Sequence, residues 1–256
     1  MRTIFFLFVT IFSFSFFISK KENTSVKVAE ISNKVKPSEK GFTVLELFTS
    51  EGCSSCPSAD ELMQKYAARD NVFVLSYHVT YWNRLGWKDK FSQPSFDERQ
   101  YNYSAKFKHD GVYTPQVVIN GGYECVGSRG SEIEKQVQST QAMSPINTLT
   151  VSQKISDNNV EANCEVSGDI TGKTLHLVLV ETALSSNVKS GENSGRTLQH
   201  ANVVRATQIQ PLNANKNYTT HFTLDSDWKK QNCKIIAFTQ DENTLKITGA
   251  NQSVLR

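Results

Sequence analysis

The sequence predicts an α/β domain with a helical insert, followed by an antiparallel β-sandwich-like domain. Three observations support this fold class. A β-rich run, a Cys-x-x-Cys turn, a helix-forming segment and a second apolar run follow one another between residues 43 and 77. An aromatic and polar segment, residues 79–111, comes next. After residue 145, short runs alternate apolar and polar residues between turn residues, which is typical of an antiparallel sandwich.

The first twenty residues differ in kind from the rest of the chain. Arg2 is followed by an apolar and hydroxyl run from Ile4 to Ile18, which is rich in phenylalanine and ends before two lysines. This pattern predicts a secretory signal peptide over residues 1–20, because the run is shorter than the roughly 20 apolar residues that span a bilayer. We therefore expect an exported protein, periplasmic or secreted. An uncleaved N-terminal segment is the alternative, and it would be the chain's contact with a membrane.

The rest of the chain divides by composition. Residues 21–40 are polar and rich in lysine, so we expect a linker there. The α/β domain is expected over residues 41–144 with its insert at 79–111, and the β-rich domain over 145–256. The formal net charge of the 256 residues is +3, and no basic block interleaved with aromatic residues occurs. This balance gives no reason to expect a nucleic-acid partner.

Each expected element follows from a local pattern. The runs at 43–48 and 72–77 should form parallel strands joined by a right-handed crossover. The other elements expected in the first domain are helices at 59–68 and 131–141 and a hairpin of strands at 116–120 and 123–126. The strands expected in the second domain are 148–155, 159–166, 174–184, 203–209, 218–224, 234–239 and 245–250.

The pair Cys53 and Cys56 is the strongest chemical signal. Its spacing places both sulfurs on the first turn of a helix that follows a strand, and Pro57 suits the first helical position. The helix N-terminus stabilises a thiolate, so we expect Cys53 to attack a disulfide and Cys56 to resolve the product. The expected partners are protein thiols or disulfides, or a redox partner protein, and no cofactor is expected.

Two other interpretations of the cysteine pair compete with this one. A purely structural disulfide is the stronger alternative, because a Cys-x-x-Cys pair in an exported protein can simply stay oxidised. A zinc site would need a second pair of ligands with comparable spacing. The sequence contains no second Cys pair of that kind, so no metal site is expected.

The dipeptide Thr114-Pro115 is the second signal. Proline is normally excluded from central strands, yet this one leads directly into a strand and a Gly-Gly hairpin. We expect a cis peptide bond here, facing the cysteine turn as in thioredoxin folds. A substrate chain could then pair with the Thr114 backbone as an added strand, so Thr114 and Pro115 are candidate substrate-binding residues. With the cysteine turn, this feature makes the α/β domain thioredoxin-like.

Two polar residues are candidate modulators of the cysteine pair. Glu51 lies close to the turn, where it could act from the surface, and a solvated turn residue is the favoured alternative. His78 ends the second strand and could approach the turn, while a strand-end histidine with one hydrogen bond is the commoner outcome. Trp82 and Trp87 are interpreted either as a hydrophobic wall beside the turn or as core of the insert.

The remaining cysteines carry no comparable pattern. The chain has five cysteines, and an odd number leaves one thiol over. A bridge between Cys164 and Cys233 is one hypothesis, since it would close a long loop of the second domain. Cys125 would then be unpaired. The polar stretch at 191–200 is expected to be a structured surface loop.

Several segments resemble a known family. The stretch from Val44 to Pro57 resembles the opening of a secreted thioredoxin-like family that is catalogued only as a domain of unknown function, number 1223. The other similar segments are His78 to Asp89, Arg99-Gln100, Tyr113 to Gln116, Gly191 to Leu198 and Val203 to Arg205. The resemblance covers roughly residues 42–250. It implies a thioredoxin-like domain with a β-rich C-terminal extension, and it implies no established substrate.

One position departs from ordinary thioredoxins. Those proteins commonly bury an acid six residues before the first cysteine, and this chain has Leu47 there. Glu46 is adjacent, but strand alternation points it to the opposite face. The sequence therefore predicts an exported thiol–disulfide oxidoreductase that lacks one usual proton carrier. The alternative is a non-catalytic secreted binding or assembly module with a structural Cys-x-x-Cys disulfide.

Overall fold

The computed structural model describes residues 40–255. The expected signal peptide at 1–20 and the expected linker, apart from residue 40, therefore lie outside the described residues. Within the described range, no helix has the length and apolar character needed to cross a membrane.

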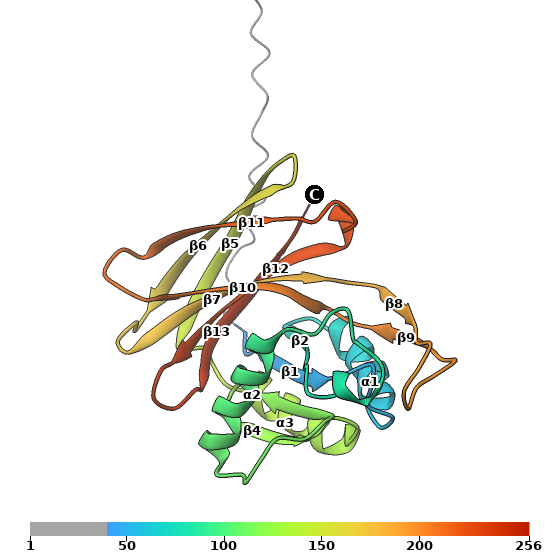
Figure 1. Ribbon diagram of the computed structural model, residues 1–256. Helices are drawn as coiled ribbons and strands as arrows, with labels where there is room; N and C mark the ends of the chain where they lie inside the picture. The colour runs from blue at the N-terminus through green and yellow to red at the C-terminus, as the bar shows by residue number, and fades with distance from the viewer. Residues whose placement is uncertain (1–39, 256) are drawn as a thin grey trace, which may run out of the picture. The chain divides into compact units, whose positions relative to one another are not determined.

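The strand–helix–strand unit predicted around the cysteine turn is confirmed. Strands β1 (Thr43–Thr49) and β2 (Val72–His78) pair in parallel, and α1 (Pro57–Ala67) connects them (Figure 1). Every residue of both strands is buried. Parallel strands with both faces covered are expected to be this apolar.

The predicted hairpin also forms. Strand β3 (Gln116–Ile119) pairs antiparallel with β1, and β4 (Tyr123–Val126) pairs antiparallel with β3. Helix α3 (Gly130–Gln141) packs with α1 on one face of these strands. Helix α2 (Pro94–Phe107) packs on the other face. The cysteine turn at the start of α1 therefore lies on the α1 and α3 side of the sheet.

The C-terminal half supplies nine further strands. They are β5 (Asn147–Ser156), β6 (Asn159–Gly168), β7 (Lys173–Glu181), β8 (Leu184–Asn187), β9 (Thr197–His200), β10 (Val203–Pro211), β11 (Asn217–Thr223), β12 (Cys233–Asp241) and β13 (Ile247–Val254). Two short 3₁₀ helices lie at Asn83–Leu85 and Lys230–Asn232. The main sheet has the order β13-β12-β7-β10-β2-β1-β3-β4. Strands β11-β6-β5 form a second sheet, and β8-β9 form a separate hairpin.

The predicted fold class is wrong. One mixed sheet of eight strands crosses the expected boundary near residue 145, in place of a compact thioredoxin-like α/β domain followed by a separate sandwich. The described residues are 43% strand and 20% helix, and they belong to one compact unit. Helix α2 does not form a separate insert. Its Phe96 and Tyr103 belong to the same hydrophobic core as Phe48 and Phe238, which come from the two halves of the chain.

Strand β7 explains why the two halves join. Its run Leu175–Val180 is almost entirely apolar, which indicates a strand buried on both faces. Val178 and Val180 face the core beneath α2, whereas Leu177 and Leu179 face the three-stranded sheet. A two-layer sandwich leaves one face of each strand exposed, so β7 does not fit there. It lies instead between β12 and β10, and β10 continues the sheet to β2.

Candidate functional site

Cys53 and Cys56 form a disulfide at the start of α1, with their Cα atoms 5.4 Å apart. Pro57 occupies the first turn of the helix, as predicted. The Ser55 hydroxyl lies 3.4 Å from Cys53 Sγ. Ser54 and Ser55 are exposed, but both cysteine side chains are fully buried. Neither sulfur therefore reaches the surface.

The segment between β8 and β9, residues 188–196, covers the cysteine turn and is named the covering loop. Asn193 in this loop is fully buried. Its side-chain amide donates hydrogen bonds of 2.9 Å to the carbonyl oxygens of both Glu51 and Cys53. A polar loop was expected here, and the structure makes it a direct neighbour of the disulfide.

Two further contacts hold the covering loop in place. The Glu192 carboxylate accepts a hydrogen bond of 3.0 Å from the backbone N–H of Ser54, between the two cysteines. Hydrogen bonding to the side chain and to the backbone of Ser54 lowers the pKa of Glu192. The hydroxyl of Ser190 donates to the carbonyl oxygen of Gly86 at 2.6 Å. The loop thus connects the cysteine turn with the segment that follows β2.

The bond between Thr114 and Pro115 is cis, as predicted. A Cβ atom added at Gly127 would lie 3.2 Å from Pro115 Cβ and 3.1 Å from the Cβ of Ala59 in α1. Pro115 therefore lies beside that helix. Trp82 Nε1 donates to the Thr114 hydroxyl at 2.8 Å, and Trp82 Cβ would lie 3.3 Å from a Cβ added at Gly52. Trp82 therefore lies between the cysteine turn and the cis peptide.

Five buried ionisable side chains meet beside the turn and are named the buried polar cluster. They are Glu51, Asp60, His78, Asp89 and His200, each at most 3% exposed. His78 Nδ1 lies 2.7 Å from Asp89 Oδ2. His200 Nδ1 lies 3.3 Å from Asp60 Oδ1, and His200 Nε2 lies 3.4 Å from Glu51 Oε1. The two imidazole rings are 4.8 Å apart between centroids.

The buried polar cluster carries charge. Burial opposes protonation of His200, but its contacts with Asp60 and Glu51 outweigh burial and raise its pKa to about 10. Burial also opposes ionisation of Glu51, yet hydrogen bonds from His200 and from Trp87, whose Nε1 lies 2.7 Å away, hold its pKa below the usual value. The pKa of Asp89 is lowered against the effect of burial by the charge and hydrogen bond of His78.

These positions correct and extend the sequence analysis. The favoured interpretation of Glu51 as a solvated turn residue is wrong, because it is fully buried. His78 reaches the turn through its neighbours in the cluster. Asp60 was missed, although it lies with Met63 on the buried face of α1, where a carboxylate is unusual. Asp89 and His200 lie in stretches that the sequence singled out, His78 to Asp89 and 191–200, but no pattern there indicated that these side chains meet.

The other three cysteines, among the described residues, are buried free thiols. The hypothesis of a bridge between Cys164 and Cys233 is therefore wrong. Burial raises the pKa of Cys125 and of Cys164 to about 12, and that of Cys233 to about 11. Thiols in such surroundings stay protonated at neutral pH and are poor nucleophiles.

A second buried charged group lies on the other face of β1 and is named the Glu46 network. Leu47 lies in the core beside α1, while Glu46 points to α2, as strand alternation predicts. Arg99 Nε donates to Glu46 Oε2 at 2.5 Å, and the Tyr103 hydroxyl donates to the other carboxylate oxygen. Gln240 Nε2 donates to the Tyr103 oxygen at 2.9 Å.

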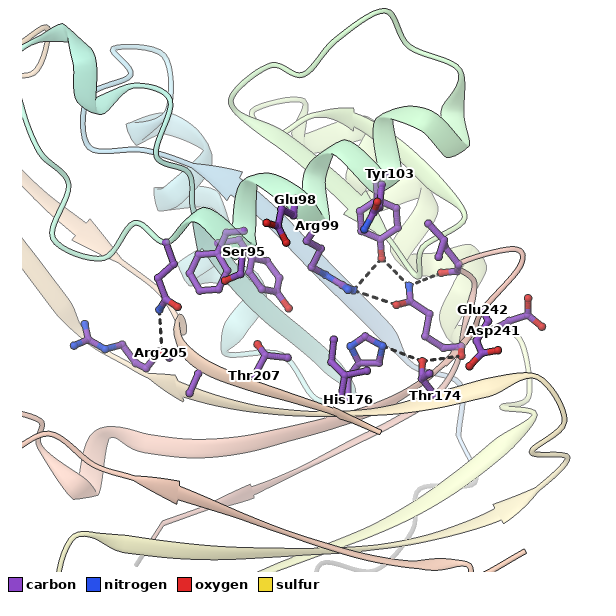
Figure 2. A pocket seen from close by; sticks show the side chains of 18 residues that line it. Ser95, Glu98, Arg99, Tyr103, Thr174, His176, Arg205, Thr207, Asp241 and Glu242 are labelled. Carbon is purple, nitrogen blue, oxygen red and sulfur yellow. Dashed lines mark hydrogen bonds between the residues drawn. The ribbon is translucent and has the colours of Figure 1, made fainter. Parts of the chain in front are cut away.

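A cavity of about 600 Å³ lies between α2 and strands β7, β10 and β12 (Figure 2). Arg99, His176, Arg205 and Thr207 are among the residues that line it. No residue of the cysteine turn or of the buried polar cluster lines it. Its volume is within the range of small-molecule sites in proteins.

Comparisons with known proteins place the chain in a family. It is similar to protein AGR_C_4864 from Agrobacterium tumefaciens, with 28% identity, a TM-score of 0.65, and coverage of 86% of this chain and 96% of that one. HBP35 of Porphyromonas gingivalis shares the fold at 18% identity and a TM-score of 0.61, with coverage of 86% and 77%. No curated protein matches. A family model described as protein of unknown function (DUF1223) matches residues 44–240, and the chain therefore belongs to the DUF1223 family.

Proposed function

We propose that this protein is an exported thiol–disulfide oxidoreductase that works through Cys53 and Cys56. The observation that carries the proposal is the disulfide of this pair at the N-terminus of α1. A helix N-terminus favours a thiolate there, and the Ser55 hydroxyl can donate a hydrogen bond to it. Pro115 lies beside α1, and we propose that the Thr114 backbone pairs with an incoming chain as an added strand.

The proposed reaction transfers two electrons. In the reduced protein, the Cys53 thiolate attacks a partner disulfide, which forms a mixed disulfide and releases one partner thiolate. The Cys56 thiolate then attacks the sulfur of Cys53, which releases the second partner thiol and closes the Cys53–Cys56 bond. The protein loses two electrons and the partner gains them. Oxidation of a partner dithiol is the same sequence in reverse.

Access to the disulfide requires movement of the covering loop. Both sulfurs are buried under this loop, and Asn193 and Glu192 bond it to the turn. Loops held by a few hydrogen bonds open at a small fraction of the global unfolding free energy. We propose that a partner chain reaches Cys53 when the loop opens, and that Trp82 then lies at the margin of the exposed site.

Export to the periplasm or to the medium is part of the proposal. It is supported by the signal-like residues 1–20 and by the compartment in which such a disulfide persists. Fusion of residues 1–40 to alkaline phosphatase, which needs its own disulfides, provides a test. The proposal expects activity from the fusion and loss of that activity when Arg2 to Ile18 is deleted. An inactive fusion, or activity that the deletion leaves unchanged, would contradict it.

A trapping experiment tests the exchange reaction. The variant Cys56→Ser keeps the attacking thiol but cannot resolve a mixed disulfide. With glutathione disulfide it should accumulate one glutathione adduct on Cys53, as seen by mass spectrometry. The matched variant Cys53→Ser should react at least tenfold more slowly. Equal slow reaction of both variants, with unchanged circular dichroism, would contradict the proposal.

A second candidate function is supported by the cavity beside α2. A non-catalytic binding module with a structural disulfide would use this cavity, which has room for a small molecule and lies apart from the cysteine turn. In that case the Cys53–Cys56 bond would resist the glutathione pool. The two candidates therefore differ in reduction potential.

A further inference from the structure

We propose that Asp60, His78 and His200 bind one divalent transition-metal ion, Zn²⁺, at a buried site beside the cysteine turn. One ligand atom from each of these side chains lies within 4.8 Å of the other two. The proposal does not depend on thiol–disulfide exchange, because the metal would be held by imidazole and carboxylate groups while the disulfide stays closed.

The distances are close to those of a metal site. Zinc binds nitrogen and oxygen ligands at about 2.0–2.2 Å, so ligand atoms in a tetrahedral site lie about 3.3 Å apart. His200 Nδ1 and Asp60 Oδ1 are already 3.3 Å apart. With all three ligand atoms within 4.8 Å of one another, His78 would need to approach the other two by about 1.5 Å at most.

Each histidine has a carboxylate beside one ring nitrogen, as metal-binding histidines usually do. His78 Nδ1 lies 2.7 Å from Asp89, and its Nε2 is fully buried without a hydrogen-bond partner among residues 40–255. His200 Nε2 lies near Glu51, and its Nδ1 lies near Asp60. In metal sites, a carboxylate on one imidazole nitrogen orients the ring so that the other nitrogen meets the metal.

The charges of the buried polar cluster also favour a divalent cation. Three carboxylates and two histidines are almost completely buried in the cluster. Buried carboxylates are costly unless a cation or a metal compensates them. A doubly charged ion among Asp60, His78 and His200 would supply that compensation. A protonated His200 without metal is the rival arrangement.

The ligand types select the class of ion. Ca²⁺ and Mg²⁺ prefer sets made only of oxygen, whereas two imidazoles and one carboxylate suit zinc and its first-row neighbours. Such an ion would join three elements: α1 through Asp60, β2 through His78 and β9 through His200. Since β9 follows the covering loop, the metal would also fix that loop over the disulfide.

Metal content of the full chain tests the proposal. The protein is produced with added Zn²⁺, purified with its disulfide intact, and analysed by inductively coupled plasma mass spectrometry. Wild type and the control His109→Gln, which changes a histidine paired with Glu124 outside the cluster, should each hold about one zinc. Asp60→Asn keeps the side-chain shape and should reduce zinc content at least tenfold. Wild type without zinc, or equal content in all three proteins, would overturn the proposal.

Cobalt spectroscopy gives a second readout that needs no variant. Co²⁺ bound by Asp60, His78 and His200 should show visible bands of a low-coordinate nitrogen and oxygen site without thiolate charge-transfer absorption. Strong thiolate bands would place the ion on cysteines and contradict the proposal, as would the spectrum of hydrated Co²⁺. If Asp60→Asn does not fold, this spectrum decides alone. The zinc content of Cys56→Ser is measured as well. Zinc retained in this variant, which cannot form the disulfide, would show that metal binding and thiol–disulfide exchange are independent.

Discussion

The two buried charged groups of this protein, on opposite faces of the main sheet, differ in how completely their hydrogen bonds are made. In the Glu46 network, both carboxylate oxygens accept hydrogen bonds from Arg99 and Tyr103. In the buried polar cluster, His200 Nε2 and Glu51 Oε1 face each other at 3.4 Å, too far apart for a well-formed hydrogen bond, and His78 Nε2 has no hydrogen-bond partner within the described part of the chain. A complete network stabilises a fold, whereas buried groups with incomplete hydrogen bonds are costly and call for a functional explanation.

The largest expected effect is in the Glu46 network. Arg99→Met would leave the fully buried Glu46 carboxylate without its cation, which should lower the free energy of unfolding by about 3–5 kcal/mol. Urea unfolding followed by circular dichroism measures this loss. The control Arg69→Met breaks a pair with Glu134 in which both side chains are 37% exposed, and it should cost about 0–1 kcal/mol. Equal losses in the free energy of unfolding would show that the Glu46 network stabilises the protein no more than an exposed ion pair does.

Removal of metal should have the next largest effect. If Zn²⁺ occupies the buried polar cluster, a free concentration one hundred times its dissociation constant stabilises the protein by about 2.7 kcal/mol. Chelation should therefore lower the melting temperature of wild type and leave that of Asp60→Asn unchanged. Scanning calorimetry with and without chelator measures this difference. An identical response of the two proteins would assign the stabilisation to another site.

The covering loop should control access to the disulfide. Asn193→Ala removes two hydrogen bonds to the turn, worth about 1–2 kcal/mol together. The Cys53–Cys56 bond should then be reduced by dithiothreitol about tenfold faster, because the loop opens more often. The control Asn187→Ala changes an exposed residue of the same hairpin that contacts Thr197 and should leave the rate unchanged. A rate unaffected by Asn193→Ala would mean that the loop does not limit access.

The smallest expected effect is at Ser55. Its hydroxyl lies 3.4 Å from Cys53 Sγ, and a typical hydrogen bond contributes about 1 kcal/mol. In the reduced protein, Ser55→Ala should therefore slow alkylation of Cys53 at neutral pH about fivefold. The control Ser58→Ala removes a hydroxyl that donates to a backbone carbonyl oxygen, and it should have no such effect. Equal alkylation rates for wild type and Ser55→Ala would exclude a role for this hydroxyl.

Features encoded in short stretches could be predicted from the sequence. The strand before Cys53, the helix from Pro57 and the next strand follow from hydrophobic periodicity and residue spacing. The cis bond before Pro115 was expected from a proline that leads into a strand after a strand, a Cys-x-x-Cys turn, a helix and a second strand. The opposite directions of Glu46 and Leu47 follow from strand alternation.

Features that depend on distant pairing were missed. Strands β2 and β10 pair through Ser76 and Val203, which joins the two halves of the main sheet. No local sequence pattern indicates that these two strands would be neighbours. The buried polar cluster combines Asp60 with His200, 140 residues later. Burial of the cysteines was missed for the same reason, because the covering loop arrives from the C-terminal half. Alternation shows which side of a strand is apolar, but it does not show what covers that side.

The reduction potential of the Cys53–Cys56 disulfide distinguishes a working exchange centre from a structural bridge. The oxidised protein is equilibrated with glutathione or dithiothreitol buffers of known potential, and the two thiols are then trapped by alkylation and counted by mass spectrometry. A working exchange centre should have a midpoint above about −300 mV, where exchange with cellular thiols is reversible. A midpoint below that value, with the native fold retained, would identify a structural disulfide and rule out the proposed exchange reaction.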